Sequence, residues 1–163
     1  MFLQRSKFPA QALAAIFLAS LAAVAVALVA QHAFGVKPCP WCVMQRGVFL
    51  LIAAVAGLGW LLKSARPIRS ASLILIMVLG VAGVAAAAFQ HQVASKLASC
   101  DMTLADRLLS ALDLENLLPS VFMVTASCSE AAAYRLIGLP YELWSGLLFV
   151  AISIASLVAV KKR

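Results

Sequence analysis

Four long apolar runs constrain the fold of this 163-residue chain more than any other feature. They cover about residues 10–30, 43–62, 71–89 and 143–160, and a helix of roughly 20 apolar residues spans a bilayer. Backbone groups in lipid must be hydrogen-bonded within their own segment, so we expect each run to be helical. The sequence therefore predicts an all-α, polytopic membrane protein, with a four-helix transmembrane bundle in a single domain over residues 1–163.

The composition supports a membrane protein and argues against nucleic-acid binding. Hydrophobic residues make up 64% of the chain and charged residues 12%. The net charge of +7 comes mostly from basic residues at the ends of the apolar runs, with no contiguous basic stripe. The first run follows Arg5 and Lys7, as a signal peptide core would, but its length predicts an uncleaved transmembrane helix. In the third run, Gly80 and Gly83 are expected to let a neighbouring helix approach closely.

The basic residues also predict how the chain crosses the membrane. Those near the two termini and between the second and third runs are Arg5, Lys7, Lys63, Arg66, Arg69, Lys161, Lys162 and Arg163. Because positive residues stay on the cytoplasmic side, both termini are expected there, and the loops at about 31–42 and 90–142 are expected outside. The cysteines at positions 39, 42, 100 and 128 all fall in these two outer loops.

Cys39 and Cys42 stand at the start of the second apolar run, separated by Pro40 and Trp41. Proline fits the first turn of a helix, which would place Cys42 in that turn, near the partial positive charge of the helix end. Arg46 follows four residues later on the same helical face. A thiolate beside a cation is the reactive form of cysteine, so the sequence predicts a redox-active pair. Such a pair can also be half of a zinc site, but no second pair and no His-x-x-x-His is present, and no metal site is predicted.

The longer outer loop carries the other two cysteines, Cys100 and Cys128. Four cysteines on an oxidising face suggest two disulfides. One hypothesis is a non-catalytic membrane scaffold, in which both disulfides only brace the loop. The loop closed by Cys39 and Cys42 is too short to stabilise much chain, and an outside protein could reach the second pair. These features favour redox exchange over bracing. Four cysteines permit three pairings, and the spacing leaves the pairing open.

A short amphipathic helix is expected after Cys100. Thr103 and Asp106 have the spacing of a capping box, and the leucines at 104, 108, 109 and 112 form an apolar stripe that suits the bilayer surface. Pro119 is expected to end this helix. A second brief helix is predicted from near Ser127 to Gly138.

Electrons delivered to the cysteines need an acceptor. The sequence holds no haem, flavin or metal-cluster pattern, so a lipid-soluble quinone near Cys42 is the remaining candidate. Arg46 could stabilise negative charge on a quinone carbonyl oxygen. His91, at the outer end of the third run, lies at a similar depth and is a second candidate, whereas His32 is interpreted as an interfacial histidine.

The chain resembles the DsbB family of bacterial disulfide bond formation proteins along essentially its whole length. The matching segments are Lys37-Pro38-Cys39-Pro40-Trp41-Cys42 with Arg46, Gln90-His91, Ser99-Cys100-Asp101, Pro119-Ser120-Val121-Phe122, Cys128 with Glu130, and Gly138-Leu139-Pro140-Tyr141-Glu142-Leu143-Trp144. This ordered set is far more specific than a single Cys-x-x-Cys.

The resemblance implies a thiol:quinone oxidoreductase of the bacterial inner membrane that reoxidises a periplasmic DsbA-like thiol oxidase. It also implies a relay in which the reduced partner attacks Cys100 of a Cys100–Cys128 disulfide. Cys128 then exchanges with Cys39, and Cys42 passes electrons to the quinone beside Arg46. Neither the choice between ubiquinone and menaquinone nor the DsbA paralogue follows from the sequence.

Overall fold

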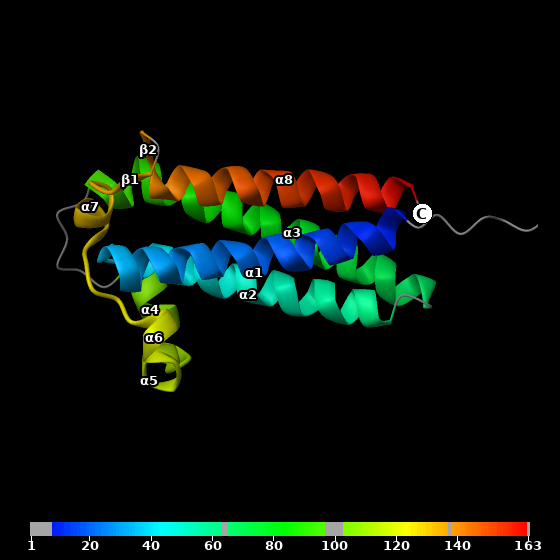
Figure 1. Cartoon of the computed structure of the whole chain (residues 1–163), viewed down its shortest axis with the longest axis horizontal. Coiled ribbons are helices and arrows are strands. Elements are labelled where there is room, and N and C mark those ends of the chain that lie inside the picture. Colours follow the sequence, from blue (N-terminus) through cyan, green and yellow to red (C-terminus); the bar gives the residue numbers. More distant parts are fainter. Residues whose placement is uncertain (1–7, 63–64, 97–102, 137, 163) are drawn as a thin grey trace, which may run out of the picture.

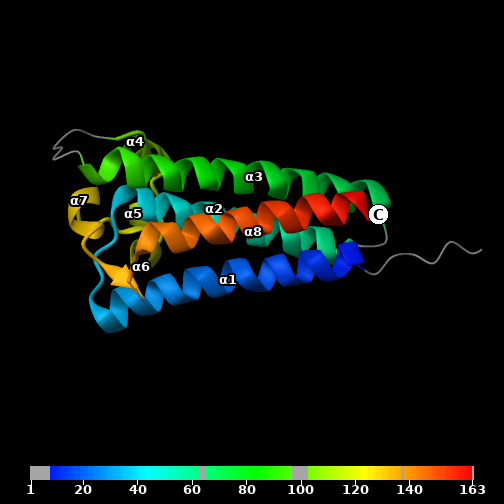
Figure 2. The same ribbon diagram turned by 90° about the horizontal axis from the view of Figure 1, so that it is seen from above.

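Four long helices form the body of the molecule (Figure 1). The computed structural model describes residues 8–62, 65–96, 103–136 and 138–162. Its long helices are α1 (Phe8–Phe34), α2 (Pro40–Leu61), α3 (Arg66–Gln92) and α8 (Tyr141–Lys161). Each is long and apolar enough to cross a membrane, and successive helices run in opposite directions (Figures 1 and 2). The predicted fold class, a helical multi-pass membrane bundle, is confirmed.

The helices extend beyond the apolar runs at the end of the bundle that carries the cysteines. The first and third spans were expected to end near residues 30 and 89, but α1 continues to Phe34 and α3 to Gln92. The added turns carry polar residues that bond to other parts of the protein. Gln31 accepts a hydrogen bond from Arg46, and Gln90 donates to cysteine sulfur. Helical structure therefore persists past the apolar boundary because these polar side chains find partners inside the protein.

The helices pack around two stacked aromatic rings. Phe149 of α8 lies on Phe49 of α2, with ring centroids 4.0 Å apart and planes 3° from parallel. Gly83 of α3 faces Phe149, and a Cβ atom there would lie 2.5 Å from the ring atom Cδ1. Gly80 lies in the same way against Ser153. The expectation that these two glycines permit close helix approach is confirmed.

Short elements cover one end of the bundle, opposite the C-terminus (Figures 1 and 2). They are η1 (Ala94–Lys96), α4 (Leu104–Ala111), α5 (Leu114–Leu117), α6 (Pro119–Phe122), α7 (Cys128–Ala131), β1 (Arg135–Leu136) and β2 (Leu139–Pro140). The two strands pair antiparallel, with Arg135 opposite Pro140. This cover brings the residues of the long outer loop onto the ends of α2 and α3.

The amphipathic helix begins where the sequence predicted. Thr103 and Asp106 form the expected capping box at the start of α4, and Leu109 is buried. The helix does not continue to Pro119, because Asp113 adopts a left-handed conformation with φ of 51° and ends it. Pro119 instead occupies the first turn of the next short helix, α6, a position that suits a residue without a backbone N–H.

The second predicted helix is correct at its start and wrong at its end. Ser127 caps α7 through a capping box with Glu130, but the helix stops at Ala131 and not at Gly138. Gly138, with φ of +80°, lies in the turn that joins β1 to β2. A glycine in the left-handed region serves equally well after a helix and within a turn, so its presence alone did not distinguish the two structures.

A substitution at Gly83 tests the packing of α3 on α8. Gly83→Ala is expected to destabilise the protein by about 1–3 kcal/mol, the usual cost of overpacking, because the new methyl group would overlap the buried Phe149 ring. Gly47→Ala is the matched control, since its Cβ would lie 3.6 Å from Phe122 Cε1, an ordinary contact. Thermal unfolding in detergent measures both variants. Equal melting temperatures for the two would contradict this account of the packing.

Candidate functional site

The site is built on the first turn of α2. Cys39 is the residue that caps this helix, and its sulfur accepts a hydrogen bond from the backbone N–H of Cys42, 3.3 Å away. Pro40 follows the cap in the first turn, as the sequence predicted, and donates no N–H of its own. The helix start therefore directs its free N–H groups toward cysteine sulfur, at the end where its dipole favours negative charge.

Cys39 contacts both of the other described cysteines. Its sulfur lies 2.8 Å from Cys42 Sγ, and Cys39 also packs in one buried cluster with Cys128, which α7 brings in from the long loop. The backbone N–H of Trp41 is directed to the Cys128 sulfur. Cys39 is fully buried and Cys128 is 8% exposed. Cys100 lies outside the residues that the structure describes.

The contact between Cys39 and Cys128 affects the two thiols in opposite ways. It raises the pKa of Cys39, as do the contact with Cys42 and burial. The same contact lowers the pKa of Cys128, against the opposing effect of burial. It therefore favours the thiolate form of Cys128 over that of Cys39. Disulfide exchange begins when a thiolate attacks a disulfide sulfur, and Cys128 is placed for such an attack when Cys39 is paired with Cys42.

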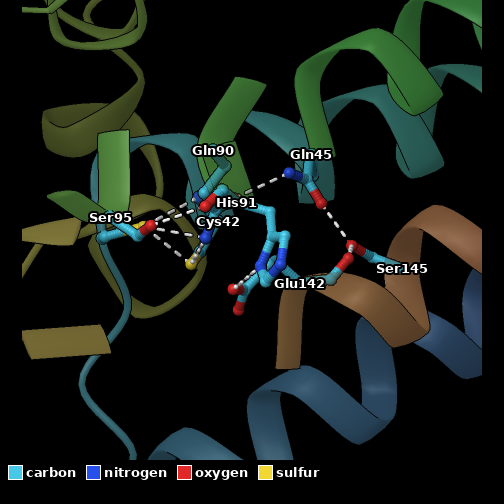
Figure 3. A network of polar contacts seen from close by, with 8 residues as sticks. Cys42, Gln45, Gln90, His91, Ser95, Glu142 and Ser145 are labelled. Carbon is cyan, nitrogen blue, oxygen red and sulfur yellow. Dashed lines mark hydrogen bonds and ion pairs between the residues drawn. The ribbon is translucent and has the colours of Figure 1, made fainter. Parts of the chain in front are cut away.

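Two buried glutamines, Gln90 of α3 and Gln45 of α2, form a hydrogen-bonded network that reaches the sulfur atoms (Figure 3). The side-chain nitrogen of Gln90 donates to Cys42 Sγ at 3.1 Å and to Cys39 Sγ at 3.4 Å. Its oxygen accepts from Gln45 Nε2 at 2.8 Å, and the Gln45 oxygen in turn accepts from the hydroxyl of Ser145. Sequence reasoning assigned no role to either glutamine. The signal that it passed over was a polar residue at the outer end of each of two apolar spans.

Arg46 is buried and bonds to two segments outside its own helix. Its Nη1 donates to Gln31 Oε1 of α1 and, at 3.0 Å, to the backbone oxygen of Val121 in α6. These bonds hold the guanidinium at the end of the bundle that carries the cysteines. The sequence placed Arg46 on the same helical face as Cys42, and both residues line one cavity.

This cavity has a volume of about 620 Å³ and is lined mainly by apolar side chains. Its walls come from α1 (Ala19, Ala22, Ala23, Val26, Ala27), α2 (Cys42, Gln45, Arg46, Phe49), α3 (Gln90) and α8 (Tyr141, Glu142, Trp144, Ser145, Leu147, Leu148). An apolar cavity of this size, with a few convergent polar groups, is typical of a site for a small organic molecule. Cys42, which contacts Cys39, forms part of the wall of this cavity.

The two histidines do not line this cavity. His91 is about half exposed, and its Nδ1 lies 3.1 Å from Oε1 of Glu142, a buried residue that does line the cavity. Among the described residues, His91 thus connects to the cavity through Glu142 (Figure 3). His32 bonds through Nε2 to the backbone oxygen of Ser120 at 3.1 Å, which joins the end of α1 to the loop cover.

Comparison with known proteins assigns the chain to a family. The family model described as "Disulfide bond formation protein DsbB" matches residues 9–159. A Disulfide bond formation protein B from Dechloromonas aromatica is 33% identical over 165 residues, which cover 96% of each chain. The protein of that name from a Polaromonas species is 31% identical over 156 residues, 94% of this chain and 92% of the relative. One from Cupriavidus necator is 32% identical over 155 residues, 91% and 90% of the two chains.

The four membrane-spanning helices, the cysteine cluster at one end of the bundle and these matches along nearly the whole sequence agree with one another. The chain belongs to the DsbB family of disulfide bond formation proteins.

Proposed function

We propose that the protein is a thiol oxidase that takes electrons from a periplasmic DsbA-like dithiol protein and passes them to a membrane quinone. The observation that carries this proposal is the position of Cys39, in contact with both Cys42 and Cys128. A loop cysteine and a membrane-edge pair are thereby joined at the wall of an apolar cavity. Family membership supports disulfide formation as the overall activity.

The charges at the two ends of the bundle support an orientation for this activity. Arg66 and Arg69 begin α3 and Lys161 ends α8, and both of these helix ends lie far from the cysteine cluster (Figure 1). Because basic residues favour the cytoplasmic side, we place both termini in the cytoplasm and the cysteines in the periplasm of the inner membrane. The cysteine cluster then faces the compartment in which disulfides form.

The cavity residues fit a quinone, either ubiquinone or menaquinone. A volume of about 620 Å³ bounded by alanine and leucine side chains accommodates an apolar ring, and Arg46 supplies a fixed cation at one wall. When bound, a quinone supplies an acceptor for two electrons and two protons. Cys42 is the cysteine that would face it, because Cys42 lines the cavity and neither Cys39 nor Cys128 does.

The first half of the relay proceeds by disulfide exchange among the cysteines of the chain. A thiolate of the partner attacks Cys100, the Cys100–Cys128 bond breaks, and Cys128 leaves as a thiolate. Cys128 then attacks Cys39, with which it is already in contact. The Cys39–Cys42 bond breaks, and its electron pair remains on Cys42 as a thiolate at the cavity wall.

The second half releases the oxidised partner. The second thiol of the partner attacks the mixed disulfide and frees Cys100. Cys100 attacks Cys128, restores their disulfide and releases Cys39 as a thiolate. The Cys39–Cys42 pair then holds the two electrons that the partner has lost, next to the cavity.

Quinone reduction by the purified protein tests the proposed function. With a reduced DsbA-like dithiol, the wild type is expected to reduce quinone, whereas Cys42→Ser and Cys100→Ser should show no turnover above background, since each breaks one exchange step. Ser110→Ala, at an exposed position on α4, is the control and should remain active. A wild type that is inert with every quinone and reduced partner would show that the cysteines are structural braces.

A substitution at Arg46 tests the quinone site separately from the exchange steps. Arg46→Gln is expected to lower the rate of quinone reduction by roughly 100-fold, the usual effect of losing one donor to a developing negative charge. Oxidation of the partner in a single turnover without quinone should be unchanged. Arg66→Gln, at the opposite end of the bundle, is the matched control. Equal loss of both activities in Arg46→Gln would mean that Arg46 only holds the loop in place through Val121.

The same assay tests the predicted contribution of His91. Because His91 connects to the cavity through Glu142, His91→Gln should reduce the quinone rate less than Arg46→Gln does. An equal or larger loss in His91→Gln would show that the histidine acts on the quinone directly.

A further inference from the structure

Gln90 is a buried amide placed against the reacting sulfur atoms. It lies in the last turn of α3 and is 2% exposed. Its side-chain nitrogen is 3.1 Å from Cys42 Sγ and 3.4 Å from Cys39 Sγ. Burying an amide in an apolar bundle is costly unless its hydrogen bonds are made, and here its donors are directed at the cysteine pair.

The orientation of this amide is set by a chain of hydrogen bonds across three helices (Figure 3). Ser145 of α8 donates to the oxygen of Gln45 in α2, and Gln45 donates to the oxygen of Gln90 in α3 at 2.8 Å. With its oxygen engaged in this way, Gln90 presents its NH₂ group to sulfur. A thiolate can only accept hydrogen bonds, so this direction of donation suits an ionised Cys42.

We propose that Gln90 is a catalytic residue that stabilises Cys42 as the leaving thiolate when Cys128 attacks Cys39, and that Gln45 and Ser145 are positioning residues for it. This inference deepens the proposed function and rests on its exchange step. In that step the Cys39–Cys128 bond forms, the Cys39–Cys42 bond breaks, and the electron pair of the broken bond stays on Cys42. Hydrogen bonds to ionised acceptors are the strong ones, and exchange is faster when the leaving sulfur is more stable as a thiolate.

The arrangement also gives the exchange a direction. Cys128 contacts Cys39, so attack at Cys39 requires Cys42 to leave. The shorter of the two distances from Gln90 is the one to Cys42. Gln90 therefore favours release of the sulfur that lines the cavity over release of the one that faces the loop.

Several other groups influence the charge on Cys42 and are the same in every protein compared in the test. Arg46 lies on the same helix, and Tyr141 and Glu142 of α8 line the same cavity. Cys39 and Cys128 approach from the other side, and both are replaced by Ser in all the proteins compared. His91 of α3 is directed to Glu142. A change seen on removing the Gln90 amide is therefore measured against a constant set of charges.

Alkylation of Cys42 as a function of pH tests the proposal. The experiment uses full-length protein in which Cys42 is the only cysteine, with Ser at positions 39, 100 and 128. In that background Gln90→Leu is expected to slow alkylation by iodoacetamide at pH 7 roughly tenfold, because a hydrogen bond to the thiolate is lost. The rate at high pH, where every variant is fully ionised, should be unchanged. Gln45→Leu should give a smaller effect of the same sign, because Gln90 then loses its fixed orientation.

Gln92→Leu is the matched control, since Gln92 is exposed and lies two residues further along α3. An alkylation profile in Gln90→Leu that matches the single-cysteine parent would overturn the proposal and leave Gln90 a packing residue. If Gln90→Leu fails to fold, Gln90→Met and Gln45→Leu provide the same comparison, and unchanged profiles in both would overturn it equally. No quinone or partner enters this measurement. If Gln90→Leu shifts the profile while the wild type with all four cysteines reduces no quinone, the proposed function fails and the hydrogen bond from Gln90 to Cys42 stands.

Discussion

The cap that Cys39 places on α2 is the interaction on which the rest of the site depends. Its sulfur accepts the N–H of Cys42, while the preceding N–H, from Trp41, is directed to Cys128. A helix start that would otherwise leave donors unsatisfied thus binds two cysteine sulfurs. Pro40 contributes no N–H, so the first donors of the helix are the N–H groups of Trp41 and Cys42. One is directed to Cys128 of the loop and the other to Cys39 of the pair, and this brings the loop into contact with the pair.

Packing of the long helices places further polar side chains around the cysteines, beyond the donors of the helix start. Packing of α3 on α8 through Gly83 and Phe149 brings the end of α3 beside the cysteines. Gln90 and Gln31 then lie where polar groups meet the apolar interior, and each is satisfied by a residue of the site. Polar side chains at membrane depth are costly without partners, so the same bonds that order the site also make these residues tolerable in the bundle.

Much of the fold could be predicted because hydropathy, and the residues that start and end helices, act over short stretches of sequence. Apolar runs of membrane-spanning length, Pro40 at a helix start and the Thr103–Asp106 box all act within a few residues. The glutamine network could not be predicted, since Gln45 and Gln90 are 45 residues apart and meet only through helix packing. The position of His91 shows the same limit. The depth of a residue in the membrane can be predicted from the sequence. Adjacent residues of a helix point in different directions around its axis, so Gln90 faces the cysteines and His91 faces Glu142.

In the proposed relay Cys39, and not Cys42, exchanges with Cys128. Disulfide formation in two double variants distinguishes the two cysteines. Cys42→Ser with Cys100→Ser leaves Cys39 and Cys128, whereas Cys39→Ser with Cys100→Ser leaves Cys42 and Cys128. On mild oxidation with diamide, the first is predicted to form an intramolecular disulfide much faster than the second, because Cys39 already contacts Cys128. Equal rates, or faster pairing of Cys42 with Cys128, would contradict the account.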